Sequence, residues 1–434
     1  MPVYKLPNIP GFLLFRVFFN ARFYYPVFAL MFLQFGLTLS QFSLSNLIWA
    51  VAIVSLEVPS GALADVVGRK KLVVLAAFLM ILEMVVLLVA TPEPGPLLLA
   101  LFCLNRFLSG AGEAMASGAD EALAYDTLRE HGLEDRWGEV LEWLNRLSSL
   151  AFFIAMLVGA AVFDPELLNR VLGWFNAHPN LTAADTLKLP LWLTLGNAVI
   201  SLLAALSLKP LQAESGASKR GQRPWKKAME VGKSLLTRKN VLVVILAVVL
   251  FDQTARASLT MSSNTLAAYG IEPGWFGVIS AGFALLGFFV AGPARKIAEG
   301  QSQQFVFWLL VSLSLLGLTG QAGSRGLGGL FFLGLLSVVM NLVQFFSSFF
   351  LNKLSESEER ATLLSFKGLM SNVGFGVVSL YYALVSGLMA TEQSKDYLRS
   401  LYSLPLYFAV GVFLFLIVYR IGGEDRREGN EESQ

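Results

Sequence analysis

The sequence predicts an all-α membrane protein with twelve transmembrane helices in two pseudo-symmetric six-helix bundles. Charge is scarce: 15% of the 434 residues are charged and 55% are hydrophobic, whereas soluble proteins carry about 25% charged residues. The apolar residues come in blocks of roughly 20, the length that crosses a bilayer as a helix. A polar, basic stretch near the middle of the chain divides these blocks into two sets of six.

Apolar blocks and turn signals place the twelve spans along the chain. The first six are expected at about 23–40, 41–64, 71–90, 97–122, 139–162 and 189–208. The second six are expected at about 240–266, 275–297, 303–320, 327–351, 362–389 and 399–420. Residues 11–20 are too short to span. They form either an interfacial lead-in or the hidden start of the first helix.

Lysine and arginine predict the orientation of the chain. With the N-terminus in the cytoplasm, 24 of these cations fall in cytoplasmic segments and 5 in the opposite loops, as the positive-inside rule requires. Both termini are therefore expected in the cytoplasm. The expected parts are a bundle at 1–208, a basic cytoplasmic linker at 209–239, a second bundle at 240–420 and a polar cytoplasmic tail at 421–434. Within the linker, residues 224–236 either lie on the lipid surface or serve topology alone.

The rare residue types exclude several function classes. Cys103 lies in an apolar run and both histidines, His131 and His178, lie in predicted loops, so a metal site is not expected. No GxxxxGK[ST] loop is present, so ATP drive is not indicated. No nucleophile–histidine arrangement is present either. The sequence therefore predicts neither an enzyme nor a bound cofactor.

The stretch EVPSGALADVVGRKK, residues 57–71, interrupts two apolar runs with specific chemistry. Asp65 and Arg69 are four residues apart and would be neighbours on a continuous helix. Gly61 is expected where two helices approach closely, and Gly68 where the backbone needs a conformation that other residues resist. Pro59 is expected to bend or weaken the end of the second helix. The alternative is a loop that only obeys the positive-inside rule, which explains the cations but not the acid and the glycines.

This stretch, with Gly61, Asp65, Gly68, Arg69 and Lys70, resembles the loop signature of the major facilitator superfamily. Three further segments add to the resemblance, which covers nearly the whole chain: RFLSG at 106–110, EALAYDTL at 121–128 and RATLLS at 360–365. Echoes between the halves, such as SGALADVVGRKK and AGPARKIAEGQS, are typical of duplicated bundles. The fifth helix departs from the proton-driven antiporters of the family, because it lacks their glycine–proline pair.

The resemblance implies a cytoplasmic gate. Asp65 would face the positive N-terminal end of the eleventh helix. Arg69 would pair with an acid at the cytoplasmic end of the fourth helix, where Asp126 is the first choice and Glu121 the second. These contacts, with the two glycines, would hold the cytoplasmic side closed.

Ionisable residues inside spans are functional candidates because they are costly to bury in lipid. Arg106 and Glu113 lie two turns apart on the fourth helix, and Asp252 and Arg256 lie one turn apart on the seventh. Burial disfavours the charged form of a carboxyl group and a nearby arginine favours it. Proton coupling is therefore predicted, with Arg106 tuning Glu113 and Arg256 tuning Asp252. The alternative is that both are static ion pairs.

The resemblance further implies that the first, fourth, seventh and tenth helices line a central cavity. Polar residues on these helices are the candidate substrate contacts: Gln34, Ser109, Ser117, Gln253, Asn341 and Gln344. Aromatic runs such as QFFSSFF at 344–350 are candidates for an apolar pocket.

Three further charged positions carry weaker expectations. Glu83 lies in the middle of the third span without an evident partner in the sequence, where it either pairs with another residue or faces a lipid-filled groove. Asp120 is expected to be solvated near the interface, and Lys367 to extend to the cytoplasm.

The predicted function is secondary active transport by alternating access, with proton-coupled export of an amphipathic or drug-like compound. The alternatives are uptake of a small anionic solute, which the two arginines favour, and a lipid flippase. The expected partners are a small-molecule substrate, protons and membrane lipids, with no nucleic acid. We expect a monomer in a bacterial inner membrane, although the sequon Asn180-Leu181-Thr182 leaves a eukaryotic source open.

Overall fold

The computed structural model describes residues 3–176, 180–210, 238–354, 360–389 and 394–431. The described chain is helical throughout and holds no strand. It divides into two compact units, one of residues 1–228 with 271–281 and the other of residues 229–270 with 282–434. The predicted surface segment at 224–236 lies outside the described residues.

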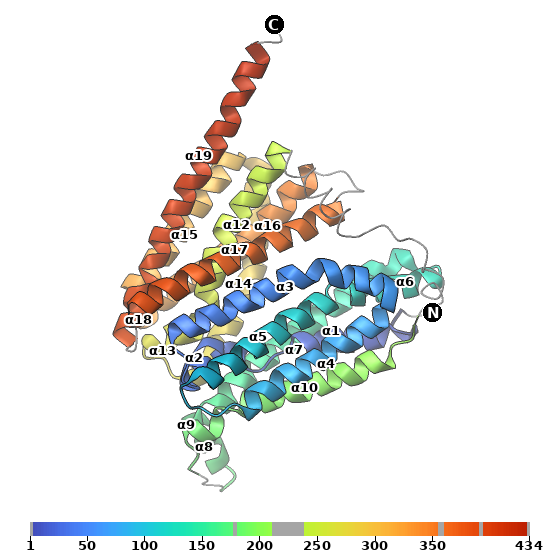
Figure 1. Ribbon diagram of the computed structural model, residues 1–434, viewed down its shortest axis with the longest axis vertical. Coiled ribbons are helices and arrows are strands. Elements are labelled where there is room, and N and C mark those ends of the chain that lie inside the picture. The colour runs from blue at the N-terminus through green and yellow to red at the C-terminus, as the bar shows by residue number, and fades with distance from the viewer. Residues whose placement is uncertain (1–2, 177–179, 211–237, 355–359, 390–393, 432–434) are drawn as a thin grey trace. The chain divides into compact units, whose positions relative to one another are not determined.

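Figure 1 labels most of the helices of the first unit. Its longer helices are α1 (Ile9–Asn20), α3 (Leu39–Val67), α4 (Arg69–Val89), α5 (Pro96–Ala116), α6 (Ala119–Glu130), α7 (Trp137–Phe163) and α10 (Leu189–Ser207). Its shorter helices are η1 (Val3–Lys5), η2 (Tyr25–Val27), α2 (Phe28–Gln34), η3 (Glu134–Arg136), α8 (Pro165–Gly173) and α9 (Ala183–Thr186).

The second unit contains α12 (Lys239–Thr260), α13 (Ser262–Ala268), α15 (Gln303–Gly323), α16 (Leu327–Leu354), α17 (Arg360–Leu388), α18 (Ser394–Leu401) and α19 (Ser403–Glu431). The remaining helix, α14 (Pro273–Gly300), starts in the segment grouped with the first unit and continues into the second. Eleven described helical segments are long and apolar enough to cross a membrane. These eleven match the second to twelfth spans expected from the sequence.

The first predicted span, 23–40, is wrong as a continuous helix. In its place the structure has α1, an irregular stretch at 21–24, the short η2 and α2. Of the two interpretations of residues 11–20, the hidden start is the closer one, because α1 packs against α10 and α7 of the same unit. Thus residues 9–34 make a broken first helix, and the twelve-helix fold is kept.

Side chains from other helices satisfy the backbone at this break. Asn197 of α10 donates its amide to the carbonyl oxygen of Ala21 at 2.5 Å, and the backbone N–H of Phe23 donates to Thr194 at 3.0 Å. Gly159 of α7 lies directly against the carbonyl of Phe23, where a Cβ atom would collide. An interrupted helix is tolerated at membrane depth only where such partners replace the lost hydrogen bonds.

The predicted fourth and seventh spans run past the ends of their helices. The fourth span, 97–122, is divided at Gly118, whose φ of 76° separates α5 from α6. The second, 240–266, ends its first helix at Thr260 and continues as the separate α13. A positive φ suits glycine, which lacks the Cβ atom that would clash there.

Small residues bring α5 close to its neighbours in the first unit. A Cβ atom on Gly110 would lie 2.7 Å from the carbonyl oxygen of Trp49 in α3. On the other side, α4 and α5 pack along their lengths, as Figure 1 shows. The buried cluster there includes Ala76, Ala77 and Ala116. Close packing of small residues is a main source of helix association in membranes.

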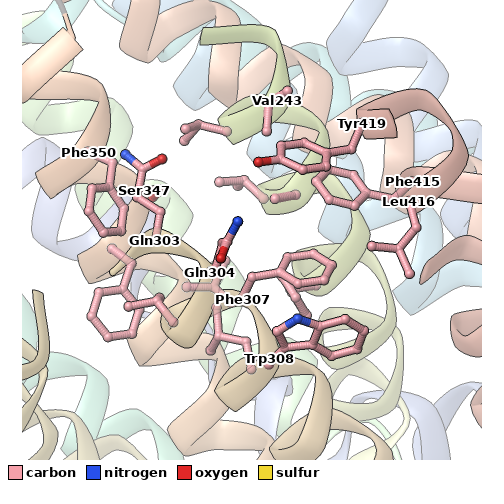
Figure 2. Close-up of a pocket in the computed structure, with 18 residues that line it drawn as sticks. Val243, Gln303, Gln304, Phe307, Trp308, Ser347, Phe350, Phe415, Leu416 and Tyr419 are labelled. Carbon is pink, nitrogen blue, oxygen red and sulfur yellow. The ribbon is translucent and has the colours of Figure 1, made fainter. Parts of the chain in front are cut away.

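In the second unit α12 is the most central helix, since it contacts α15, α16, α17 and α19. A cavity of about 290 Å³ opens beside it, between the first turns of α12 and α15 and parts of α16 and α19 (Figure 2). Part of the aromatic run at 344–350 lines this cavity, through Phe346, Ser347 and Phe350.

Candidate functional site

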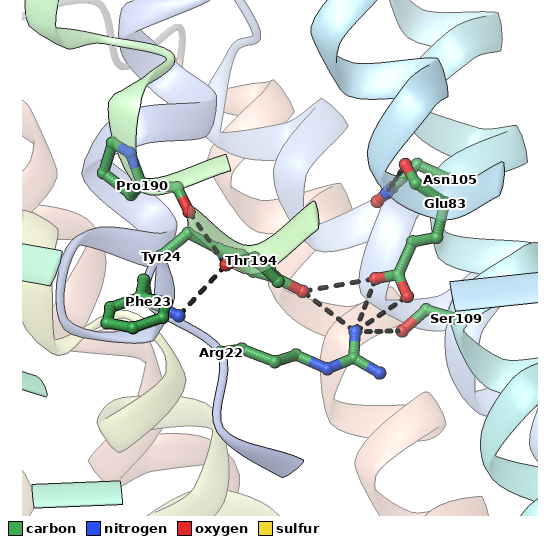
Figure 3. Close-up of polar contacts among 8 residues, drawn as sticks. All are labelled: Arg22, Phe23, Tyr24, Glu83, Asn105, Ser109, Pro190 and Thr194. Carbon is green, nitrogen blue, oxygen red and sulfur yellow. Dashed lines mark hydrogen bonds and ion pairs between the residues drawn. The ribbon is translucent and has the colours of Figure 1, made fainter. Parts of the chain in front are cut away.

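A buried ion pair lies within the first unit. Arg22, in the irregular stretch after α1, donates to both carboxylate oxygens of Glu83 in α4, at 2.6 and 2.8 Å. The arginine side chain is 2% exposed and the glutamate side chain is wholly buried. Figure 3 shows the two side chains meeting among the helices.

Three polar residues surround this pair. The hydroxyl of Tyr24 donates to Glu83 at 3.2 Å, and Ser109 of α5 accepts from Arg22 at 3.3 Å. The amide of Asn105 donates to the backbone carbonyl of Glu83 at 3.0 Å. A buried ion pair is stable only when further hydrogen bonds satisfy its members. This set satisfies the carboxylate of Glu83, while the Nε atom of Arg22 has no hydrogen-bond partner among the described residues.

The structure shows that Glu83 is a pairing residue, one of the two alternatives for it, whereas the expected place of Arg22 was wrong. Glu83 has a partner, and Arg22, counted among the cytoplasmic cations of the N-terminal segment, lies inside the bundle. The reason is the broken first helix, which turns Arg22 toward α4. The available signal was Glu83 itself, because a carboxylate in mid-membrane requires a cation or a proton.

Arg106 of α5 lies among aromatic rings rather than acids. Its guanidinium carbon is 5.2 Å from the ring centre of Phe28 and 5.5 Å from that of Trp49. Arg106 is 7% exposed, and its Nε atom is buried without a hydrogen-bond partner among the described residues. The side chain therefore keeps the capacity to bind an anion.

The expected tuning of Glu113 by Arg106 does not rest on an ion pair, because none forms between them in the described structure. Seven residues of helix separate the two by about 10 Å along the axis, which is too far for contact. Glu113 is half-buried. Nearby, Arg16 of α1 pairs with Asp120 at 3.3 Å, and Asp120 is 1% exposed. The expectation that Asp120 is solvated was therefore wrong.

The acid and base of the seventh helix do pair. Arg256 lies 2.6 Å from Asp252, one turn away on α12, and Asp252 is wholly buried. Arg256 also donates to Asn372 of α17 at 3.0 Å and lies over the ring of Phe375. This arginine is thus held by three groups at once.

A chain of hydrogen bonds extends from this pair. Gln344 of α16 donates to Asp252 at 3.3 Å. Lys367 of α17 donates to Gln344 and to Ser347, each at 3.3 Å. Lys367 is therefore partly buried and hydrogen-bonded within the unit, where a side chain free of protein partners was expected. We call these residues, Asp252, Arg256, Gln344 and Lys367, the Asp252 cluster.

The candidate substrate residues fall into different environments. Ser109 accepts a hydrogen bond from Arg22, and Gln253 accepts one from Tyr407 at 3.0 Å. Asn341 donates to the carbonyl of Ser337 at 2.8 Å. Gln34 and Ser117 are exposed at the ends of α2 and α5. The structure brings only Gln344 directly to a charged candidate.

The corner after α3 is built around Gly68. Its φ of 101° ends α3 and starts α4, as its glycine identity predicted. Asp65 and Arg69 therefore lie on different helices and not on one continuous turn. Pro59 lies inside α3, which continues to Val67. Among the described residues no close approach is made at Gly61, because a Cβ atom there would meet none of their atoms within 4 Å.

Arg69 forms an ion pair with Asp126 of α6, the first of the two acids expected for it. Asp126 is also 3.2 Å from Arg129. Glu121 is exposed in the first turn of α6. The side chain of Asp65 lies outside the described residues, so its proposed contact stays a prediction.

Residues 11–379 match the family model of the Major Facilitator Superfamily. The chain belongs to this superfamily. It is therefore a multi-pass integral membrane protein of a transporter family, and not an enzyme. No match was found among curated protein sequences.

Solved structures of this superfamily resemble the chain over nearly its whole length. The nucleoside transporter NupG has a TM-score of 0.69 at 15% identity, and the match covers 96% of this chain and 99% of NupG. A bacterial homolog of the human lysosomal transporter Spinster has a TM-score of 0.69 at 11% identity, covering 95% and 96%. A D-xylose–proton symporter has a TM-score of 0.65 at 13% identity, covering 94% and 95%. At such identities the likeness establishes the fold alone.

Proposed function

We propose that the protein is a proton-coupled secondary transporter that exports an amphipathic compound, with Asp252 as the proton carrier. The observation that supports this most is the Asp252 cluster. A wholly buried carboxylate is paired with one cation, Arg256, and connected through one amide to a second, Lys367. Ionisable groups placed in this way inside a membrane are typical of ion pathways.

The chemistry of the cluster suits coupling. When Asp252 is charged, its carboxylate balances the charge of Arg256 and the ion pair holds the two side chains together. A proton on Asp252 would remove this attraction and free Arg256, whose remaining described polar partner is Asn372. Because burial and the arginine act on the carboxyl group in opposite directions, a conformational change that alters either one takes up or releases the proton.

In the first unit a buried cation lies among aromatic rings, which suits an amphipath. Arg106 offers a cation beside the rings of Phe28 and Trp49, so one place combines charge with apolar area. A guanidinium flanked by aromatic faces binds molecules that carry both an acceptor group and a ring.

Inverted membrane vesicles test the proposal, with the fluorescent amphipath Hoechst 33342 as the probe. A pH gradient, acid inside, should drive the probe into vesicles that contain the protein. Vesicles without the protein give the passive uptake of this weak base, which vesicles with the protein should exceed, and nigericin should abolish uptake in both by collapsing the gradient. Equal uptake with and without the protein would contradict export of this class of compound.

Uptake of a small anionic solute is the second candidate, and Arg106 favours it. The buried Nε atom of this residue, which has no hydrogen-bond partner in the described part of the chain, can donate to a carboxylate. The likeness to NupG and to the D-xylose–proton symporter adds nucleosides and xylose, which are uncharged, as separate compounds worth testing.

Thermal shift measurements distinguish this candidate. Benzoate should raise the melting temperature of the unmodified protein and of the control Arg325→Gln, whose exposed arginine lies far along the sequence in the loop before α16. The increase should be lost in Arg106→Gln. If benzoate still raised the melting temperature of Arg106→Gln, Arg106 would not be the anion-binding residue.

A further inference from the structure

The cavity of the second unit is lined by residues outside the Asp252 cluster. It opens among Val243 and Val244 in the first turns of α12, Gln303 and Gln304 at the start of α15, and Tyr419 of α19. Asp252, Arg256 and Lys367 do not line it. At about 290 Å³, its volume is close to the lower limit of small-molecule pockets, roughly 300 Å³.

Aromatic rings form one wall of this cavity. Phe307 stacks on Phe415 with ring centres 4.8 Å apart, and Phe415 stacks on Tyr419 at 6.3 Å. Phe251 meets the edge of Phe307 at 5.5 Å. A continuous run of rings favours a planar aromatic guest, since aromatic pairs gain energy beyond their buried area.

Uncharged polar groups point into the same space. Figure 2 shows the amide of Gln304 and the hydroxyl of Tyr419 facing the open volume, with the amide of Gln303 and Ser347 at its other side. Neither glutamine side chain, nor the hydroxyl of Tyr419, forms a hydrogen bond to another described residue. No lining residue is charged. The free donors and acceptors therefore suit a neutral hydrogen-bonding group.

We propose that this cavity is a second binding site, which takes an uncharged, planar aromatic amphipath with a hydrogen-bonding substituent. The rings hold the planar body and the glutamine amides with Tyr419 bind the polar edge. A permanently charged ligand is disfavoured, because the lining offers no counter-charge. Ligand binding in this cavity requires no particular direction of transport and no particular coupling ion.

The site is also connected to the Asp252 cluster. Ser347 lines the cavity and accepts a hydrogen bond from Lys367 at 3.3 Å. A ligand that engages Ser347 competes for this hydroxyl group, so occupancy of the cavity acts on Lys367.

Fluorescence titration with 1-aminoanthracene, a neutral planar amine, tests the proposal on the full chain. The protein is placed in phosphatidylcholine nanodiscs, and empty nanodiscs give the background partition. Saturable binding of one probe per chain is expected. Ala247→Leu, which fills the cavity from α12, should weaken binding at least tenfold. Ala284→Leu, the same change at an exposed position of α14 outside the cavity, should leave affinity unchanged.

A second pair of variants covers the case in which Ala247→Leu does not fold. Gln304→Leu and Tyr419→Phe remove polar groups at exposed positions and should each weaken binding about threefold or more. Three results would overturn the proposal: a non-saturable signal equal to that of empty nanodiscs, affinity unchanged in all three cavity variants, or a tightly co-purifying phospholipid whose removal is needed before the probe binds. The last result would assign the cavity to an acyl chain.

Discussion

Arg22 and Glu83 illustrate how much a single buried charge demands of its surroundings. Their side chains are almost completely shielded, so each ion loses its hydration and must recover it from Tyr24, Ser109 and the partner. Such a pair adds little to stability compared with apolar residues, but the loss of one member leaves an uncompensated charge.

Replacing one member of this pair should therefore destabilise the protein strongly. Glu83→Gln leaves Arg22 without a counter-charge and should cost about 3–5 kcal/mol, seen as a lower melting temperature in detergent. The control is Glu299→Gln, which breaks the exposed pair with Arg295 and should cost at most about 1 kcal/mol. Similar shifts for both variants would show that Glu83 is not held as an ion.

At the scale of elements, the broken first helix depends on a glycine in another helix. Gly159 of α7 allows the backbone at Phe23 to come against it. Gly159→Ala should destabilise by about 1–3 kcal/mol, the usual cost of overpacking. Gly138→Ala on the same helix meets open space and should be neutral or stabilising. Urea or thermal unfolding of both variants checks this, and equal stabilities would argue against the close approach.

Residue patterns predicted most helices but not this break. Long apolar blocks identify spans because composition determines whether a segment can lie in lipid. The ends of α4, α10 and α16 therefore lie within a few residues of those expected. The break depends instead on tertiary partners, Asn197 and Thr194, which nothing local to residues 21–24 reveals. Gly118, which divides the fourth span, was visible as a turn residue within a run of small residues.

The candidate site was predictable to a similar degree. Pairs one helical turn apart, such as Asp252 with Arg256, follow from sequence spacing. The contact of Arg69 with Asp126 followed from the family resemblance. Partners that come from distant helices, such as Lys367 for Gln344 or Arg22 for Glu83, require the packed bundle and could not be found from spacing.

At the scale of the whole molecule, superfamily membership fixes the fold and the class of activity, and the cation bias predicts the orientation. Alkaline phosphatase fused to the C-terminal tail should be inactive in a bacterial host, because the tail is expected in the cytoplasm. The same enzyme inserted after Phe175, in the loop between α8 and α9, should be active. The reverse pattern would contradict the predicted topology.

Transport by Asp252→Asn in proteoliposomes shows whether Asp252 carries the proton. We expect this variant to keep substrate exchange under equal pH on both sides but to lose accumulation driven by a pH gradient. The unmodified protein and Glu299→Gln should show both activities. Gradient-driven accumulation that persists in Asp252→Asn would exclude Asp252 as the proton carrier.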